Sequence, residues 1–265
     1  MASTGDQNCV RSAFVLLWPR MANKFYEPGE QRASRVHDLF AAIARHYDVI
    51  NDLQSLGMHR GWKRRLVLLA GPRPGAFALD LCCGTGDVAF ALAKEGVKVV
   101  GLDFSASMLS VAQDRSSRRS VSARPAANLQ FVRGDAMNIP FPDASFDIVT
   151  VAYGLRNLAK FEQGLREMWR VAKPGGRLLA LDFGKPDHAL WRSLYFGYLK
   201  TFVPLFGKMF CGDAQTHAYI LESLKHYPAQ QGVAAKMREL NCASVRVVNL
   251  LGGVMTINYG EKSPT

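Results

Sequence analysis

The sequence lacks several features that would indicate other classes of protein. No apolar run approaches the roughly 18 to 20 residues of a membrane-spanning helix, and there are no internal repeats or low-complexity segments. The five cysteines are an odd number and lack the spacing of metal ligands. We therefore expect a protein of a reducing compartment, without structural disulfides or a metal. The expected location is the cytoplasm, with the inner face of the membrane as the alternative.

Acidic residues are also scarce. There are 22 of them against 33 lysines and arginines, which gives a net charge of +11. Such an excess suits either a solvated basic surface or an anionic partner such as nucleic acid, a membrane surface or an acidic ligand. The segment 116–127, with Arg118, Arg119 and Arg124, has no acidic residue. We interpret it first as an exposed loop and second as an anionic contact.

The length of 265 residues suits one sizeable α/β domain. We expect a poorly ordered extension over residues 1–30 and a single domain over 31–265. The apolar run Phe14–Trp18 is shorter than the roughly 7 to 15 residues of a signal-peptide core. Met21 is therefore an alternative start of the chain.

From Phe77 onward, strand patterns alternate with helix patterns. Strands are predicted at 77–81, 97–102, 129–132, 146–151, 177–183, 245–250 and 254–259, and helices at 88–94, 105–114, 160–171 and 233–240. This alternation predicts an α/β fold, a Rossmann-like doubly wound sheet of seven strands, mostly parallel with a C-terminal antiparallel hairpin. Two further helices, at 35–47 and 59–69, are expected to form an N-terminal helical lid over 31–74.

A glycine-rich turn follows the first strand. It contains Asp80, Gly84, Thr85 and Gly86, in the spacing Asp-x-x-x-Gly-x-Gly. Glycines let the backbone approach a ligand closely, and the helix behind them presents unpaired N–H groups. The third glycine of the dinucleotide fingerprint is missing. The turn therefore favours a nucleotide-like ligand without a pyrophosphate.

Further polar residues follow the next two strands. Asp103 ends the second strand, where its carboxylate can accept hydrogen bonds from both hydroxyls of a ribose. Together with the glycine turn, it makes an adenosine site. At this point the sequence resembles the class I S-adenosylmethionine-dependent methyltransferases. The resemblance implies that Phe104, Asp135, Ala136 and Ala152 also contact this cofactor.

The strand 146–151 leads into Tyr153-Gly-Leu-Arg-Asn157. In an open parallel sheet this end faces the ligand crevice, so Arg156 and Asn157 should point at the reacting methyl group. Methyltransferases that act on base amines typically carry an Asn/Asp-Pro-Pro-aromatic motif here. Its absence counts against methylation of amines on nucleic acid bases.

The resemblance narrows to the ubiquinone/menaquinone biosynthesis C-methyltransferase family over about residues 32–260. It rests on Tyr47-Asp48, Asn51, Ser55, His59 and Trp62, on Gly154-Leu-Arg-Asn157, and on Arg170-Val-Ala-Lys-Pro-Gly-Gly176. The chain departs from the family pattern at Ile50, Gln54, Ala172, Asp182 and Gly184, and Ala152 stands where some relatives have a serine.

The family resemblance implies methyl transfer from S-adenosylmethionine to a ring carbon of a prenylated hydroquinone, without a metal. Arg156 cannot be a base at neutral pH. We expect it to stabilise the phenolate or to position a water, with Asn157 as its orienting partner. Further candidates are Tyr47, Asp52 and His59 for holding ring oxygens or relaying the proton, and Asn51, Trp62 and Tyr153 for binding substrate.

Each of the three relay candidates has a structural alternative. His59 could cap the helix that it begins, Asp52 could pair with a nearby arginine, and Tyr47 could belong to the core of the lid. The sequence does not choose between these readings and a place in the site.

The segment 184–227 is expected to form a helical insertion over the substrate side. Its apolar stripe comprises Leu190, Trp191, Leu194, Tyr195, Tyr198, Leu199 and Phe202, followed by Phe206, Met209 and Phe210. This stripe could pack on the body of the fold, line a groove for a polyprenyl tail, or touch a membrane.

Three motifs look more like the naphthoquinone and phylloquinone branch of this family than the ubiquinone branch: Leu81-Cys-Cys-Gly84, Gly101-Leu-Asp-Phe104 and Tyr153-Gly-Leu-Arg156. This resemblance implies a naphthoquinol acceptor, demethylmenaquinol, and a benzoquinol of ubiquinone biosynthesis is the alternative. The alternative from another class is an RNA-binding methyltransferase or RNA-binding module. We expect no nucleic acid partner, and a homodimer is left open.

Overall fold

The computed structural model describes residue 44 and residues 47–120, 128–211 and 215–264, with the side chains of 119–120 and 204–219 left out. Several predictions lie outside this part of the chain. They are the N-terminal extension over 1–30, most of the helix at 35–47, the basic segment 121–127 and the side chains of Phe206, Met209 and Phe210.

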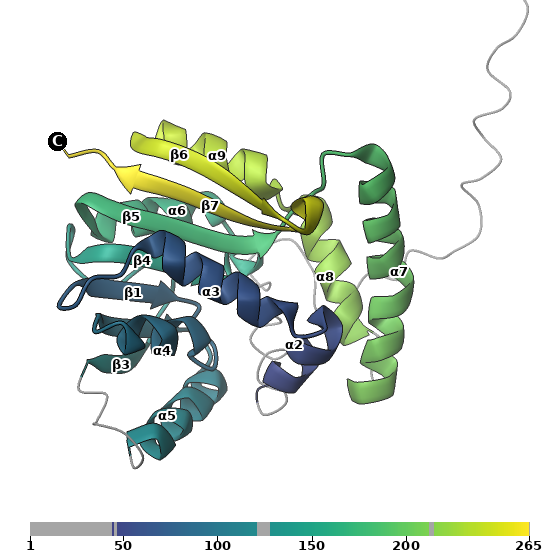
Figure 1. Cartoon of the computed structure of the whole chain (residues 1–265), viewed down its shortest axis with the longest axis horizontal. Helices are drawn as coiled ribbons and strands as arrows, with labels where there is room; N and C mark the ends of the chain where they lie inside the picture. The colour runs from purple at the N-terminus through teal and green to yellow at the C-terminus, as the bar shows by residue number, and fades with distance from the viewer. Residues whose placement is uncertain (1–43, 45–46, 121–127, 212–214, 265) are drawn as a thin grey trace, which may run out of the picture.

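In the described residues, seven strands form one sheet in the order β3-β2-β1-β4-β5-β7-β6. The strands are β1 (Phe77–Leu81), β2 (Lys98–Asp103), β3 (Leu129–Arg133), β4 (Phe146–Ala152), β5 (Ala172–Phe183), β6 (Cys242–Leu250) and β7 (Met255–Lys262). The first five are parallel, and β7 runs antiparallel to both β5 and β6 (Figure 1). The predicted fold class is confirmed.

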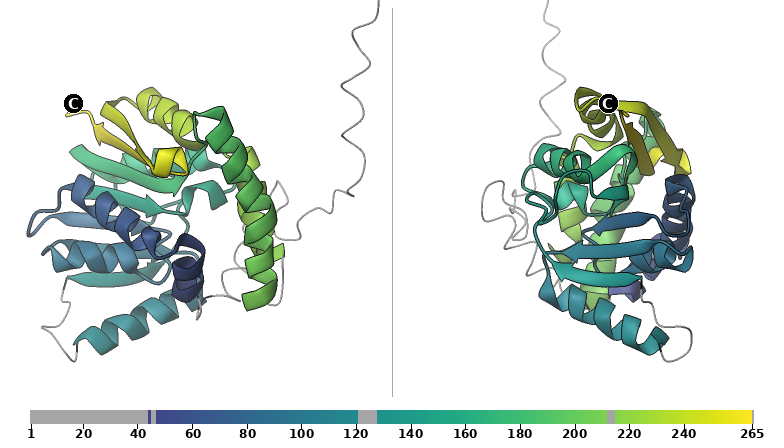
Figure 2. Two further views of the ribbon diagram at one scale, coloured as in Figure 1. Left: turned by 45° about the vertical axis from the view of Figure 1, so that its right-hand side comes forward. Right: turned by 90° about the vertical axis from the view of Figure 1, so that its left-hand side faces the viewer.

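Helices cover both faces of the sheet. The helices of the described residues are α2 (Tyr47–Ser55), α3 (Met58–Ala70), α4 (Asp87–Lys94), α5 (Ala106–Ser120), α6 (Phe161–Val171), α7 (Ala189–Cys211), α8 (Gln215–His226) and α9 (Ala229–Glu239). Helices α3 and α4 pack together on one face, and α6 and α9 pack together on the other (Figure 2).

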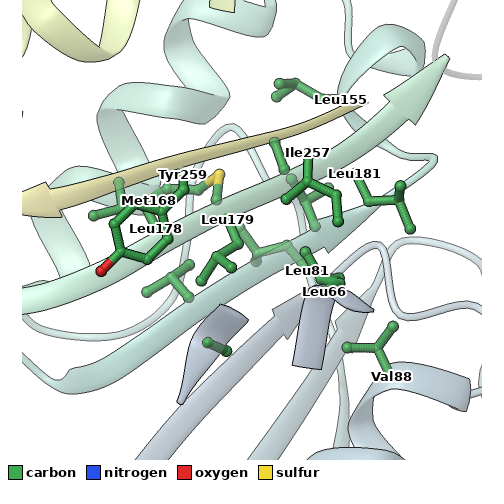
Figure 3. Packing of buried hydrophobic residues seen from close by; sticks show 14 of the residues in the cluster. Leu66, Leu81, Val88, Leu155, Met168, Leu178, Leu179, Leu181, Ile257 and Tyr259 are labelled. Atoms are coloured by element: carbon green, nitrogen blue, oxygen red, sulfur yellow. The ribbon is translucent and has the colours of Figure 1, made fainter. Parts of the chain in front are cut away.

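Apolar side chains in the central strands explain why the sheet is covered on both sides. Leu178 and Leu179 of β5 point to opposite faces, because successive side chains alternate along a strand, and both are fully buried. Leu66 of α3 and Met168 of α6 are among the helix residues that join this core (Figure 3). Strands buried on both faces are typical of doubly wound folds.

The strand order reverses at β1, which lies between β2 and β4. Ligands of open α/β sheets bind at such a point, outside the carboxyl ends of the strands. Helices α7 and α8 pack against each other and stand beside the edge to which β1 and β5 point (Figures 1 and 2). The loops after β1 and β4 therefore open toward these helices.

Several boundaries differ from the prediction, and three of the differences have a clear structural description. Helix α5 continues to Ser120, whereas a loop was expected from Ser116, because serine and arginine do not stop a helix that already packs on β2 and β3. Strand β5 begins at Ala172 rather than at 177, and residues 173–176 form a bulge within it, since Ala172 pairs with Phe146 and Arg177 with Ile148. Helix α9 begins four residues earlier than predicted, at Ala229.

Candidate active site

The turn after β1 adopts backbone conformations that favour glycine. The φ angles of Gly84 and Gly86 are +55° and +89°. A Cβ at Gly86 would lie 2.9 Å from ring carbons of Phe131 and Phe90, so a larger residue does not fit. A Cβ at Gly84 would meet no atom within 4 Å, and Gly84 lines both pockets described below. Glycine at this position keeps open space for a ligand.

Asp103, the last residue of β2, lies next to this turn. Its Oδ2 accepts a hydrogen bond from the backbone N–H of Gly84, and its Oδ1 accepts one from that of Ser105, each at 2.8 Å. These two bonds fix the plane of the carboxylate. Because a carboxylate oxygen can accept more than one hydrogen bond, the fixed group is suited to the two neighbouring hydroxyls of a ribose.

The main cavity contains about 880 Å³ of empty space, part of it open to solvent. Residues after β2 and β3 line one end of it: Asp103, Phe104, Ser105, Met108, Gly134, Asp135, Ala136 and Met137. Residues of α2 and of the loop after β4 line the other: Tyr47, Ala152, Tyr153, Gly154, Asn157, Leu158 and Ala159. The first end offers flat apolar contacts and a carboxylate, which suits an adenine.

A smaller side pocket adjoins the main cavity, with which it shares Tyr47, Cys82, Gly84, Ala152 and Tyr153. It is lined in addition by Lys63, Asp80, Cys83, Thr85, Asp87 and Val88. Lys63 was not among the site residues predicted from the sequence. Its spacing could have revealed it, since His59, Lys63, Val67 and Ala70 recur along the buried face of α3.

A network of charges joins α2, α3 and α5 to the glycine turn. Asp48 of α2 accepts hydrogen bonds from the Thr85 hydroxyl and from Arg115, both at 2.9 Å. Arg115 also reaches Asp87 at 2.6 Å, and Lys63 binds the other oxygen of Asp87 at 2.8 Å. Burial alone would raise the pKa of Asp87, but Lys63 and Arg115 outweigh it and lower that pKa to about 2.

This network includes Thr85, which the sequence predicted to contact the cofactor. Its hydroxyl donates to Asp48, and Thr85 lines the side pocket rather than the main cavity. The glycine turn and helix α2 are therefore joined through Thr85.

Asp80 lies behind the turn, also away from the main cavity. Its buried carboxyl accepts a hydrogen bond from the Thr150 hydroxyl at 2.8 Å. Burial raises the pKa of Asp80 to about 7, and the negative charge of Asp103 adds a smaller rise. Thr150, the Ala89 backbone and Lys63 act in the opposite direction but do not outweigh burial. Asp80 thus supports the turn and borders the side pocket.

The raised pKa of Asp80 predicts a pH-dependent stability. The folded chain holds this proton more tightly than the unfolded chain, so the contribution is complete below the unfolded pKa of about 4 and is lost as pH rises through about 7. We expect the free energy of unfolding of the wild type, minus that of Asp80→Asn, to fall by a few kcal/mol between pH 4 and pH 8. Urea unfolding of both proteins measures this, and a pH-independent difference would contradict it.

Comparison with known proteins decides the family. The sequence profile described as the ubiE/COQ5 methyltransferase family matches residues 28–262. The chain belongs to this family. It is 42% identical to the ubiquinone/menaquinone biosynthesis C-methyltransferase UbiE of Ectopseudomonas mendocina, over 89% of this chain and 91% of that protein. Its identity to the protein of the same name from Azotobacter vinelandii is 40%, over 89% and 92%.

Solved structures show the same fold. A SAM-dependent methyltransferase from Thermotoga maritima superposes with a TM-score of 0.59 at 16% identity, covering 85% of this chain and 99% of that one. A SAM-dependent methyltransferase from Aquifex aeolicus has a TM-score of 0.51 at 19% identity, covering 75% and 88%. The chain is thus a C-methyltransferase of ubiquinone/menaquinone biosynthesis type with S-adenosylmethionine as its cofactor, and the main cavity fits the adenosine part.

In this methyltransferase, Arg156 is not where the sequence analysis expected it. It does not line the main cavity. Its buried guanidinium pairs with Asp182 at 2.7 Å, lies over the ring of Phe183 and donates to the backbone carbonyl of Tyr153 at 2.7 Å. Arg156 therefore positions the turn η1 (Leu155–Asn157) and the backbone carbonyl of Tyr153.

Two phenols and an amide line the acceptor end of the cavity. Burial raises the pKa of both Tyr47 and Tyr153 above the ordinary value, so both stay protonated at neutral pH. The buried hydroxyl of Tyr153 has no hydrogen-bond partner among the described residues. Asn157 donates to the carbonyl of Tyr153 at 3.1 Å. This end of the cavity can donate hydrogen bonds to an oxygen of the acceptor.

The remaining sequence candidates lie outside both pockets. His59 Nε2 contacts Asp52 Oδ1 at 2.8 Å, and Asp52 also pairs with Arg60, as the structural alternative for Asp52 predicted. Burial lowers the pKa of His59 despite this contact. Asn51 lies beside Tyr47, and Trp62 packs against the hydrophobic core.

Proposed function

We propose that the chain methylates a ring carbon of a prenylated naphthoquinol, converting demethylmenaquinol to menaquinol. The observation that carries this proposal is the acceptor end of the cavity. There Tyr47 and Tyr153 present protonated phenols beside the cofactor site. A quinol is an acceptor whose ring oxygens need such donors.

The chemistry depends on the loss of one proton from the acceptor. A phenol that loses its hydroxyl proton carries negative charge that is shared with the ortho carbon, which becomes the nucleophile. The phenol proton would pass to water, and S-adenosylmethionine would supply the methyl group as its sulfur–methyl bond breaks and S-adenosylhomocysteine leaves. The methylated ring carbon would then lose its proton to solvent while the ring oxygen regains one, which restores the aromatic quinol. Tyr153 would stabilise the oxygen anion by donating its hydrogen bond, and the nearby charge of Arg156 would lower the energy of that anion.

The choice of a naphthoquinol rests on sequence motifs around Cys82, Asp103 and Tyr153. Within the cavity, these segments form the wall from the glycine turn to the acceptor end. A benzoquinol of ubiquinone biosynthesis is the alternative acceptor, since the same proton loss and the same ring-carbon attack apply to it.

Incubation with methyl-labelled S-adenosylmethionine and pairs of demethylated quinols tests the proposal. We expect a product heavier by one methyl group, with the naphthoquinol consumed at least tenfold faster than a benzoquinol of equal tail length. Mass spectrometry of the extracted quinols gives both results. Faster benzoquinol methylation would overturn the ring assignment, and methylated RNA with untouched quinols would overturn the acceptor class.

We also propose that the outer face of α7 meets an anionic membrane, from which a prenylated substrate would come. Leu190, Leu194, Tyr198 and Phe202 recur every four residues and are all exposed. The sequence of this helix contains three basic residues and no acidic one. Exposed apolar side chains flanked by basic ones are typical of helices that lie on anionic lipid. No helix in the described residues is long and apolar enough to span a membrane.

Vesicle flotation tests this face. We expect the chain to float with vesicles rich in phosphatidylglycerol at low salt, and the double variant Leu190→Ser, Leu194→Ser to bind at least tenfold more weakly, because each buried leucine contributes about 2 kcal/mol. Leu68→Ser is the matched control, since Leu68 is 69% exposed on α3, compared with 65% for Leu190. Equal loss in the control, or no flotation of the wild type, would refute the proposal.

A further inference from the structure

We propose that Lys63 binds the carboxylate of the methionine part of S-adenosylmethionine, within the side pocket beside the glycine turn. The cofactor is a long molecule whose adenosine part is assigned to Asp103 and the first end of the main cavity. Its methionine part must then extend past Gly84. The side pocket lies there, since Gly84 belongs to both pockets.

The positive charge of Lys63 makes it the partner for a carboxylate in this pocket. Among the described residues that line either pocket, Lys63 is the sole cation. Arg115 lies nearby but lines neither pocket, because its guanidinium is engaged by Asp48, Asp87 and the carbonyl of Thr85. A carboxylate that enters the side pocket therefore meets one positive group.

The side pocket also suits the positively charged ammonium group of an α-amino acid. Asp80 and Asp87 present carboxyl groups to the same space, and these can face the ammonium group of the methionine part. Lys63 is held in place by its contact with Asp87 at 2.8 Å, and its side chain is 11% exposed. A charged hydrogen bond is stronger where water is excluded, so this small pocket would distinguish an amino acid from a neutral group.

Lys63 could instead have one of two other roles. It could serve as a counter-ion of Asp87 alone, which would make it a structural residue. It could also act on the acceptor side, since its ammonium lies 5.8 Å from the centre of the Tyr153 ring. The three roles predict different effects on ligands that share the adenosine part but differ in the amino acid part.

The test is calorimetric binding of two ligands to the full chain. S-adenosylhomocysteine has the amino acid part, and 5′-methylthioadenosine lacks it. Lys63→Met should weaken binding of the first by about 10- to 150-fold, because a hydrogen bond to a charged group contributes about 1.5 to 3 kcal/mol. Binding of 5′-methylthioadenosine should change less than twofold. Arg65→Met, an exposed position on the same helix, is the matched control and should change neither.

Each other result overturns the proposal. Equal weakening of both ligands would make Lys63 a counter-ion that supports the turn, and unchanged binding of both would place the carboxylate elsewhere. If Lys63→Met does not fold, the wild type still provides a test. It should bind the carboxamide of S-adenosylhomocysteine at least tenfold more weakly than the parent compound, and equal affinities would refute a charged partner in the pocket. None of these measurements requires the quinol, so they are independent of the proposed acceptor.

Discussion

Replacement of Asp103 by alanine is expected to weaken the binding of S-adenosylhomocysteine by at least a hundredfold. The carboxylate is fixed by the N–H groups of Gly84 and Ser105, in a place where both ribose hydroxyls can donate to it. Two hydrogen bonds to a charged group contribute together about 3 to 5 kcal/mol, and each 1.4 kcal/mol corresponds to about a tenfold change in affinity. Titration calorimetry measures the effect, and turnover should fall in parallel at low cofactor concentration.

The variant must be shown to fold. Asp114→Ala is the matched control, since it removes the same charge from an exposed position on α5. Both variants should have circular dichroism spectra like that of the wild type. Retention of affinity by folded Asp103→Ala within tenfold would show that the ribose is bound elsewhere.

The part of this site that the sequence predicted is local in the chain. Gly84 and Gly86 are required by backbone angles and close contacts within one turn, and Asp103 is placed by the end of a strand that directly adjoins that turn. Such features depend on a few neighbouring residues. A short motif therefore contains the information needed to place them.

The missed features depend on partners far apart in the chain. Lys63 pairs with Asp87, 24 residues away, and Arg115 with Asp48, 67 residues away. A basic residue on an amphipathic helix is expected to face water unless a buried carboxylate meets it. The spacing along α3 places Lys63 on the buried face of the helix, but only the packing of α3 and α5 against the glycine turn brings those carboxylates within reach.

The same reason accounts for the misplaced Arg156. The sequence predicted that Tyr153 and Asn157 follow β4 at the ligand edge, and both line the main cavity. The direction of Arg156 is set by Asp182, at the end of the neighbouring strand β5. Asp182 accepts from both the Arg156 backbone and its guanidinium. The local pattern predicted the position of the loop after β4, but it did not predict which of the polar side chains of this loop would line the cavity.

The Arg156–Asp182 pair leads to the second large effect. Asp182→Asn should lower the free energy of unfolding by about 3 to 5 kcal/mol, because it leaves a buried guanidinium without its counter-charge. Turnover should fall at least a hundredfold, since Arg156 holds the carbonyl of Tyr153 and the turn before Asn157. Affinity for S-adenosylhomocysteine should stay within a few-fold, because neither Arg156 nor Asp182 lines the cofactor cavity. Asp182→Glu, which keeps the charge, should retain more stability and activity than Asp182→Asn.

A double variant separates folding from catalysis. Arg156→Met combined with Asp182→Asn removes both charges of the buried pair, and the single amide oxygen can still accept from one of the two backbone N–H groups, of Arg156 and Phe183, that the two oxygens of Asp182 now satisfy. Replacing a buried ion pair by uncharged groups is often neutral for stability, so most of the loss seen in Asp182→Asn should be recovered. Turnover should remain at least a hundredfold below that of the wild type, because the positive charge beside Tyr153 is absent. Recovery of turnover together with stability would show that Arg156 supports the fold alone and has no part in stabilising the acceptor anion.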